Sequence, residues 1–527
     1  MAWTPEFKER LELGGEPMFA VDFVSPDLFG GDYMVESRYV LHSHAIESGS
    51  EHIANAISSV SGTGQRISVR TWKSSIGGLR VGLSGANVAR FVSMAIPRGM
   101  VAEFKVGFSG MAFDEFQTVG VYAYQGLSGS RDSWVMEMYD LFSVMQAPDS
   151  VTLSSQFYKG AGTQAALSSP WVTTDSTMYS LASLSDFEKD GSGSARGLLY
   201  CEPTDGDPFY VKFTGIAGTN ISVVNANVLG TTRVNMEEGD KITAVGYVFD
   251  TVPDVAHMVL FGGLAGASTM PDDWHMNLNY SSHLVNRPDL NAWRSRYGAF
   301  YTEFNGDLVV SAPMENPYRG LEEFLSAFGS WLVFKEGGLS WRFVQRIAGT
   351  STDGELDAAE YVITDHDIER EQTYQLFNRD ARVEYFQVDF PHAIFNDGGK
   401  ISTKPGAFRH PHPSKDRAFN DDTATSNASN ALANLKGRLG PWYTRIPDEM
   451  SLTLKGWKFA ELVPGDVVSL QSEYIMNLVD SLIIFIGGSG SVYHSDTQYM
   501  VTGVDVDWAG FTTSVQLSKP PASARRF

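Results

Sequence analysis

The sequence predicts a mainly β protein, with several small β-barrel or β-sandwich domains in series and one small α+β module. Three observations predict this fold class. Short segments alternate apolar and polar residues with period two, as half-buried strands do. The 51 glycines supply turns between them. A composition of 43% hydrophobic, 12% aromatic and 19% charged residues is that of a folded chain, and 527 residues exceed one ordinary core.

Alternating segments define the first β-rich region and continue beyond it. Clusters of glycine and serine at 61–64 and 75–78 separate the early segments and have the chemistry of turns. The expected strands are Ile67–Trp72, Leu79–Leu83, Val101–Val106, Val119–Tyr124, Arg196–Tyr200 and Phe209–Phe213.

A helix followed by a hairpin is expected in the middle of the chain. Pro317 stands at a natural first-turn position. Leu321, Phe324, Leu325 and Phe328 then follow at i, i+3, i+4 and i+7, which places them on one apolar stripe. Residues 330–334 and 339–344 alternate around a Gly-containing turn and predict two antiparallel strands. A second helix is expected over 423–439, ended by Gly440-Pro441.

The expected loops lie at 189–193, 353–355 and 407–414. In the last of these, Pro411 and Pro413 exclude a central strand, because proline donates no ladder hydrogen bond. Boundaries near Asp149, Pro271 and Asp380 divide the chain into a first β-barrel domain (1–149), a second β domain or insertion (150–270), the α+β module (271–380) and a second β-barrel domain (381–527).

Charge and cysteine content limit the classes of function. The formal net charge is −22, so the basic face needed to grip nucleic-acid phosphates is lacking at domain scale. Cys201 is the single cysteine, so no internal disulfide forms, which fits a reducing cytoplasm. The N-terminus has no signal-peptide pattern, and the strongly apolar stretch Leu482–Ile486 is too short to span a bilayer. We expect a soluble, unexported chain without membrane anchoring.

No complete catalytic motif is present. The sequence contains no G-x-S-x-G elbow, no H-E-x-x-H, no P-loop and no G-x-G-x-x-G after a strand. One cysteine also excludes a zinc site built from several thiolates. We therefore expect no catalytic, cofactor-binding or metal-binding residues, no cofactor and no enzymatic activity.

Four partial motifs have a functional and a structural interpretation, and the structural one is favoured for each. Residues 186–192 begin like a calcium loop, but Gly197 stands where the closing glutamate should be, so a solvated acidic turn is expected. His42, His44 and His52 cluster in the sequence, and if 41–45 is a strand, His42 and His44 share a face and could chelate a metal. No third ligand follows at a fixed spacing, so polar side chains on an outer sheet face are expected. The others are the stiff loop with His410 and His412, and the charged turns Asp205–Asp207 and Asp365–Asp367, which could instead supply a glycosidase acid pair.

Three stretches, in this order along the chain, resemble the tail hub proteins of long-tailed bacteriophages and related gene transfer agents. The first is 122–141, where a strand ending in Gly126 leads to a hairpin partner and the corner Asp140-Leu141. The second is 316–344, with its helix and its G-x-W-L and G-x-L-x-W-R strands. The third is the L-x-P-G-D-x-V-x-L run at 462–470 followed by 499–504, where Asp466 can bond the amides of its own turn.

This resemblance implies a structural virion protein, a homotrimeric hub at the distal end of the tail, made in the host cytoplasm. In such hubs the two β-barrels of each subunit form a pseudo-sixfold ring that docks on a hexameric distal-tail protein. The other end carries the tip or fibre proteins, and the tape measure protein is a further candidate partner. DNA would meet the chain only in transit through the lumen during genome ejection.

Two alternatives stay open. The first is a virion-associated carbohydrate-active enzyme, whose β-rich, aromatic and acidic composition would be similar, although no repeating coils of a β-helix are visible. The second is a receptor-binding adhesin of the tail tip, a binding module without chemistry. Residues 156–251 match the hub family least and could form an inserted module that contacts fibres.

Overall fold

The computed structural model confirms the mainly β fold class, with many strands in several sheets and few helices. It describes residues 3–23, 39–45, 52–69, 71–84, 88–93, 96, 98–130, 133–146, 162–184, 195–224, 231–264, 268–269, 285–300, 305–310, 317–344, 359, 361–369, 386–389, 400–404, 407–409, 442, 448–472 and 498–519. The calcium-like stretch 186–192, the loops at 189–193 and 353–355, the helix expected over 423–439 and His410–His412 lie outside the described residues.

The first barrel is an eight-stranded sheet in the order β3-β2-β1-β8-β9-β10-β7-β4. Its two edge strands, β3 and β4, meet at Ala56, which lies between them in the sequence. The Ala56 amide donates to the His42 carbonyl (2.8 Å), and its carbonyl accepts from the Ser84 amide (2.9 Å). The expected strands at 79–83, 101–106 and 119–124 are confirmed in β7, β8 and β9. Its elements are β1 (Pro17–Phe23), β2 (Tyr39–His42), β3 (His52–Ile53), β4 (Ile57–Ser61), β7 (Leu79–Leu83), β8 (Val101–Phe108), β9 (Gln117–Ser130) and β10 (Ser133–Asp140), with α1 (Pro5–Leu13), α2 (Val88–Ser93), the 3-10 helix η2 (Phe113–Glu115) and α3 (Leu141–Gln146).

The strand expected over Ile67–Trp72 is wrong. Two short strands, β5 (Gln65–Ile67) and β6 (Ser74–Ile76), form a hairpin instead, and the residues between them turn back. Trp72 has a φ of 53°, outside the extended region, and its amide donates to the Ser68 carbonyl at 2.7 Å. Its indole is only 1% exposed, so the tertiary burial of this ring overrides the local alternation.

The projecting barrel follows in the sequence, in the strand order β11-β16-β13-β14-β15-β12. Its edge strands are β11 and β12. The barrel closes through a β-bridge between Leu167, which follows β11, and Ser180, which follows β12. The strands expected at 196–200 and 209–213 are confirmed in β13 and β14. The buried Cys201 lies on β13, and burial raises the pKa of its thiol. The strands are β11 (Gln164–Ala166), β12 (Thr177–Tyr179), β13 (Ala195–Glu202), β14 (Phe209–Ala217), β15 (Asn220–Val223) and β16 (Lys241–Thr251).

A helical module connects the barrels. The expected helix from Pro317 and the hairpin after it are confirmed as α6, β20 and β21. The stripe residues Leu321, Phe324, Leu325 and Phe328 are all buried, so this face supplies the module's core. Its elements are α4 (Val252–Phe261), β17 (Gly263–Leu264), β18 (Ser268–Thr269), α5 (Arg287–Phe300), β19 (Asn305–Val310), α6 (Pro317–Ala327), β20 (Ser330–Lys335) and β21 (Gly338–Phe343).

The last barrel has the strand order β22-β27-β28-β29-β26, and its edges meet where the Glu369 amide donates to the Thr453 carbonyl (3.0 Å). A three-stranded sheet, β23-β24-β25, is separate. The expected loop at 407–414 is wrong at its start, because β25 occupies Ala407–Arg409 as an edge strand, where proline can follow. The strands are β22 (Tyr361–Thr364), β23 (Phe386–Asp389), β24 (Lys400–Lys404), β25 (Ala407–Arg409), β26 (Asp448–Lys455), β27 (Val467–Gln471), β28 (Gln498–Asp507) and β29 (Thr512–Lys519).

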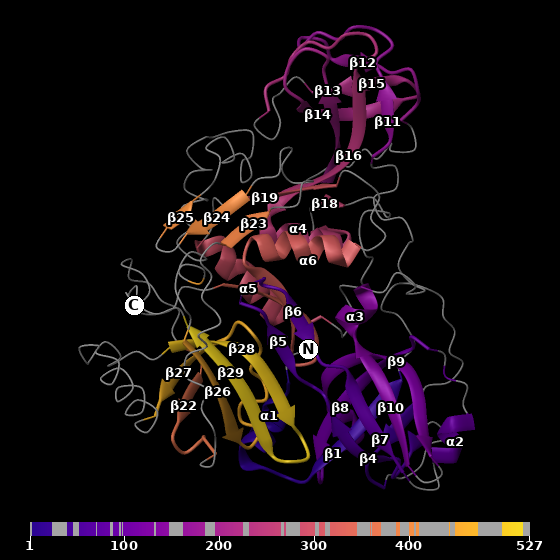
Figure 1. Ribbon diagram of the computed structural model, residues 1–527. Helices are drawn as coiled ribbons and strands as arrows, with labels where there is room; N and C mark the ends of the chain where they lie inside the picture. Colours follow the sequence, from indigo (N-terminus) through magenta and orange to yellow (C-terminus); the bar gives the residue numbers. More distant parts are fainter. Residues whose placement is uncertain are drawn as a thin grey trace, which may run out of the picture.

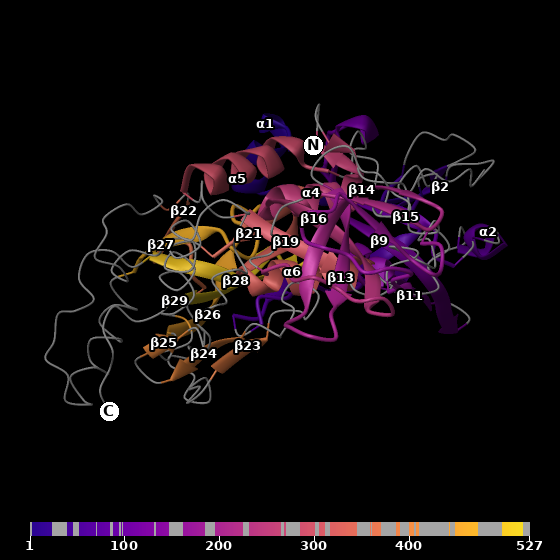
Figure 2. The ribbon, with the colours of Figure 1, turned by 90° about the horizontal axis from the view of Figure 1, so that it is seen from above.

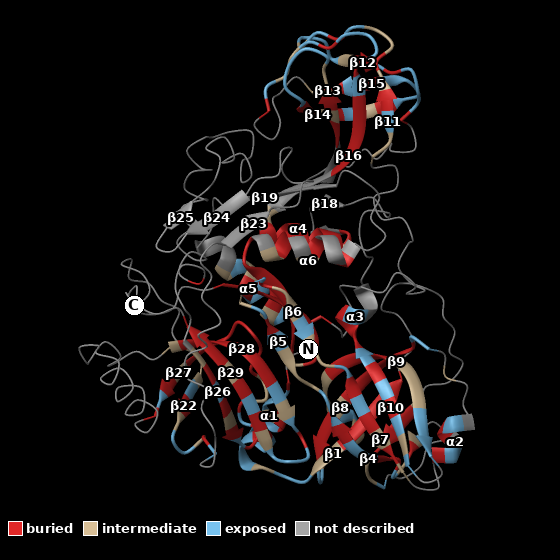
Figure 3. Cartoon of the chain, viewed as in Figure 1, coloured by how far each residue is buried: buried red, intermediate tan, exposed pale blue. Residues whose placement is uncertain are grey.

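The first and last barrels lie side by side, with the helical module across one end of the pair (Figure 1 and, from above, Figure 2). The projecting barrel stands beyond the module, on the side away from the pair. Buried residues fill the inside of each barrel and the space under α4 and α6, as Figure 3 shows. Within the described ranges, no helix has both the length and the apolar character needed to cross a membrane.

Candidate functional site: the junction of the two side-by-side barrels

The β5–β6 hairpin is an arm that leaves the first barrel and joins the sheet of the last barrel. It leaves the first barrel after β4 and returns to it at β7. In the arm, Gln65 and Arg66 pair with Val504 and Gly503 of β28 in antiparallel register. The last sheet therefore contains two strands contributed by the first barrel, and backbone hydrogen bonds tie the barrels together.

The arm also contacts the helical module. The Gln65 side chain donates from Nε2 to the Phe334 carbonyl (2.7 Å) and accepts at Oε1 from the Phe334 amide (3.0 Å). In the turn of the arm, Trp72 stacks on Trp331, with centroids 5.8 Å apart, and meets the edge of Trp442 at 5.5 Å. The helical module thus supplies backbone groups that bond to Gln65, and Trp331 and Trp442 supply rings that bury Trp72.

The Pro464-Gly465-Asp466 turn of the last barrel packs against the β20–β21 hairpin of the helical module. The Val463 amide donates to Asp466 Oδ2 at 3.1 Å, so the expected bond from Asp466 to its own turn is confirmed. Trp331 Nε1 donates to the Pro464 carbonyl at 3.0 Å. Gly465 has a φ of 109°, and a Cβ there would lie 2.8 Å from the Trp331 ring. Both the backbone conformation and the close approach require glycine.

Four buried or half-buried charges neutralise one another beside this turn. Arg342 Nε is 3.0 Å from Asp466 Oδ1, and Arg342 Nη1 is 2.6 Å from Asp289 Oδ2. Lys335 Nζ is 3.1 Å from Asp466 Oδ2 and donates to the Glu461 carbonyl at 2.6 Å. Burial would raise the pKa of Asp466, but Lys335 and Arg342 hold that pKa below its ordinary value. Two cations and two carboxylates thus make a compensated network.

Helix α1 lies against all three units at their meeting point. Lys8 Nζ is 2.6 Å from Glu336 in the β20–β21 turn and 2.8 Å from Glu461 in the last barrel. Although burial acts in the opposite direction, these two carboxylates raise the pKa of Lys8. Trp3 Nε1 donates to the Thr118 carbonyl of the first barrel at 3.0 Å. Thr4 caps the helix, since its side chain accepts from the Phe7 amide at 3.3 Å.

Two of the three stretches behind the hub resemblance, 316–344 and 462–470, meet at this junction. The W-L strand supplies Trp331, the W-R strand supplies Arg342, and the P-G-D run supplies the turn that both contact. Sequence reasoning missed Lys8, Gln65, Asp289 and Lys335, which complete the contacts. The one local signal among these elements is Thr4-Pro5, a capping residue followed by a first-turn proline, which marks the start of α1.

The other sequence candidates lie elsewhere. His42, His44 and His52 come together at the seam of the first barrel, with ring centroids 5.3 Å apart for His42 and His44 and 5.1 Å for His42 and His52. Asp205 and Asp207 lie exposed in the turn between β13 and β14. Asp367 accepts from the Thr364 amide at 2.8 Å, which makes it a turn cap. In the described part of the chain, no group of three or more His, Cys, Asp or Glu side chains could hold a metal ion.

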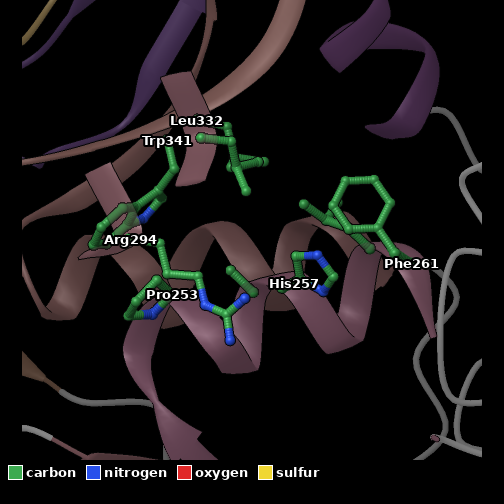
Figure 4. Close-up of a pocket in the computed structure, with 9 residues that line it drawn as sticks. Pro253, His257, Phe261, Arg294, Leu332 and Trp341 are labelled. Carbon is green, nitrogen blue, oxygen red and sulfur yellow. The ribbon is translucent and has the colours of Figure 1, made fainter. Parts of the chain in front are cut away.

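A small pocket, partly open to solvent, lies between α4, α5 and the β20–β21 hairpin (Figure 4). Its lining is mostly apolar, and Arg294, which forms an ion pair with Asp254, lies at one side. No carboxylate, thiol or hydroxyl is among its nine lining residues, which are Pro253, Ala256, His257, Leu260, Phe261, Leu290, Arg294, Leu332 and Trp341. It contains no pair of groups for acid–base or nucleophilic chemistry.

Comparisons with known proteins gave structural likenesses without sequence matches. No protein-family model and no curated protein sequence matches the chain. A 43 kDa tail protein of prophage MuSo2 from Shewanella oneidensis is similar over 96% of this chain and 99% of its own, at 10% identity and a TM-score of 0.34. Prophage tail protein gp18 from Listeria monocytogenes is similar over 88% of this chain and 96% of its own, at 8% identity and a TM-score of 0.26.

A third similar structure is an Escherichia coli component of the type VI secretion system, described as similar to the T4 tail proteins gp27 and gp5. It covers 89% of this chain and 74% of its own length, at 8% identity and a TM-score of 0.30. All three are thus tail proteins or are described as resembling them. TM-scores this low leave the function to be argued from the geometry of the chain itself.

Proposed function

We propose that the chain is a structural protein of a phage tail, the subunit of a homotrimeric hub at the distal end. One observation carries the proposal: the β5–β6 arm of the first barrel is a pair of strands in the sheet of the last barrel. Two barrels tied in this way act as one rigid building block. A threefold ring of such blocks presents six barrels around a central channel, the symmetry needed to meet a hexameric ring.

The junction supports this role because its contacts preserve the angle between the barrels. The buried network of Arg342, Asp466, Lys335 and Asp289 holds the last barrel against the helical module, since separating these groups would leave buried charges uncompensated. The arm adds backbone pairing, and α1 adds contacts to each unit. A ring under load during DNA passage would need subunits that keep their shape.

In this proposal the ends of the hub have different partners. The barrel pair would dock on the hexameric distal-tail protein and enclose the channel, with the tape measure protein as a further partner. The projecting barrel would reach toward the tip or fibre proteins. The sequence division into hub barrels 1–149 and 381–527, a second β domain 150–270 and a module 271–380 stays a prediction.

The excess of acidic residues suits a channel for DNA. An electronegative lumen would repel phosphates and keep them from adhering during genome ejection. Changing lumen carboxylates to lysine should therefore slow ejection from assembled particles. Unchanged ejection kinetics would contradict this part of the proposal.

A receptor-binding role is a second candidate, favoured by the surface of the projecting barrel. Val172, Tyr179 and Leu181 are 46%, 48% and 66% exposed, within ten residues of one another in the sequence. An apolar contact surface on this barrel would be built on these three side chains. Direct affinity of the purified projecting barrel for host cells, lost on changing these three residues, would favour the adhesin.

Light scattering on the purified chain, with a murein and polysaccharide hydrolysis assay on the same sample, tests the proposal. A mass of three times 57.8 kDa without hydrolysis is expected. An active monomer would contradict the hub and favour the carbohydrate-active enzyme. If the protein is an inactive monomer, antibody labelling of virions decides, because a hub must label the distal tail end.

A further inference from the structure

Three histidines and two phenylalanines form a ring cluster at the edge of the first barrel. His42 ends β2, His44 follows it, and His52 begins β3. Phe113 covers two of the imidazoles, with centroids 5.0 Å from His42 and 5.4 Å from His52. Phe116 covers the third, 5.6 Å from His44. The loop with η2 therefore closes over the histidines through aromatic contacts.

The cluster occupies the seam where the first barrel closes. The His42 carbonyl accepts from the Ala56 amide at 2.8 Å, and the His44 carbonyl accepts from Asn55 at 3.1 Å. The adjoining strand β3 has only two residues, His52 and Ile53, and pairs with β2 in parallel. So short a strand holds few ladder hydrogen bonds, and the side chains next to it contribute much of its attachment.

The hydrogen bonds of the cluster fit neutral imidazoles. His42 Nε2 and His52 Nδ1 are 2.9 Å apart, which requires one to donate and the other to accept. His42 is fully buried, and Nδ1 of His42 and of His44 have no hydrogen-bond partner among the described residues. A proton added to either buried Nδ1 would create a charged donor with no acceptor in this part of the structure.

Among the charged groups on the neighbouring elements, Asp22 attracts a proton on His42 and so opposes the fall in its pKa, but burial outweighs this attraction. Asp22 on β1 is 2.7 Å from Lys105 on β8, and Glu103 is 3.2 Å from the same ammonium, so both carboxylates share a cation already. Lys105 Nζ also lies 5.4 Å from the Phe113 ring centroid, on the cluster's own cover. On η2, Asp114 and Glu115 are exposed, and Glu115 accepts from the Ala112 amide.

We propose that this cluster is an acid-sensitive latch, in which protonation of His42 and His44 releases β3 and the η2 loop and opens the seam of the first barrel. Burial, with His44 and His52 nearby, lowers the pKa of His42 to about 3, and burial also lowers the pKa of His44. An opened seam returns these groups toward an ordinary pKa of about 6.5. The closed form therefore loses stability as pH falls below that value, which is the direction a latch requires.

Hydrogen–deuterium exchange at pH 7.5 and 5.0, corrected for the intrinsic pH dependence of exchange, tests the latch. Below a pH of about 6.5, the protection of backbone amides against exchange should fall in peptides covering 40–45, 52–57 and 109–117. The fall should be about tenfold per pH unit for each proton taken up on opening. Peptides from β9 and β10 should keep theirs. Equal protection of the seam at both values, or an equal loss throughout the barrel, would overturn the proposal.

Two single variants separate the latch from general acid sensitivity. His44→Gln removes a group whose pKa burial lowers, and its Nδ1 has no hydrogen-bond partner among the described residues to lose, so the loss of seam protection should be about tenfold per pH unit less steep. His366→Gln, at an exposed turn of the last barrel, is the matched control and should leave the slope unchanged. If His44→Gln does not fold, His42→Gln takes its place with the same expectation. A variant slope equal to that of the natural chain would exclude the histidines as its origin.

Discussion

Gln65 and Phe334 lie 269 positions apart, yet the side-chain amide of one pairs with the backbone amide of the other through two hydrogen bonds. The backbone of Gln65 pairs with Val504 of β28, whereas its side chain bonds to β20 of the helical module. One glutamine joins the first barrel, the last barrel and the helical module.

Replacing Gln65 with alanine should lower the free energy of unfolding by about 1–3 kcal/mol, because the Phe334 amide and carbonyl both lose a partner in a buried strand. Urea unfolding followed by tryptophan fluorescence measures the change. The matched control is Gln164→Ala, at an exposed position of β11, where a change within about 0.5 kcal/mol is expected. Equal effects of the two substitutions would show that the contact contributes nothing.

The substitution Asp466→Asn should be more damaging, at about 3–5 kcal/mol, because it leaves Arg342 and Lys335 buried with one carboxylate fewer. The same unfolding measurement applies. Glu137→Gln is the control, since the Glu137 side chain is 51% exposed and lies 3.8 Å from Arg80, which is 70% exposed. Exposed pairs contribute about 0–1 kcal/mol, so a control effect as large as that of Asp466→Asn would refute the network's role.

Local regularities made much of the fold predictable. The 3.6-residue stripe of α6, the hairpin after it and the Pro464-Gly465-Asp466 turn each depend on neighbours in the sequence, and the structure has all three. The alternation at Ile67–Trp72 failed because Trp72 packs between Trp331 and Trp442, which local periodicity does not report.

The junction could be predicted only in part. Trp331, Arg342 and Asp466 stood in motifs. Gln65, Asp289 and Lys335 carry no local signal, and their ion-pair and hydrogen-bond partners Phe334, Arg342 and Asp466 lie more than fifty positions away. The histidine cluster was visible as spacing, since 42 and 44 share a face. Its third member arrives through the parallel pairing of β2 and β3, which sequence alone did not indicate.

Acid should weaken the last barrel through Asp367. Burial would raise the pKa of this carboxyl, but hydrogen bonds from Thr364 and the charge of Lys458 lower it below its ordinary 3.8. As pH falls below 3.8 the unfolded chain takes up this proton first, so stability present above that pH is lost. Urea midpoints between pH 5 and 3 should fall less steeply for Asp367→Asn than for the natural chain. Parallel curves would show that Asp367 does not contribute.

The ion pairs of Lys8 should contribute little despite their short distances. The Lys8 side chain is 40% exposed, so solvent and salt screen its attraction to Glu336 and Glu461. Lys8→Met should cost less than about 1 kcal/mol at low salt, and the cost should shrink further in 1 M sodium chloride. A loss above 2 kcal/mol that persists in high salt would show that the attachment of α1 to Glu336 and Glu461 depends on Lys8 itself.

Gly465 should tolerate no side chain, for two separable reasons. Gly465→Ala must place a residue with Cβ at a φ of 109° and 2.8 Å from the Trp331 ring, next to the bond from Trp331 to Pro464. The control Gly239→Ala has a similar φ of 92° with no atom within 4 Å of its Cβ, so it measures the backbone cost alone. That cost is about 1–2 kcal/mol, and the contact with Trp331 should add about 1–3 kcal/mol in Gly465→Ala. Equal losses in unfolding experiments would mean that Trp331 moves aside freely, and the turn would then not fix the position of the β20–β21 hairpin against the last barrel.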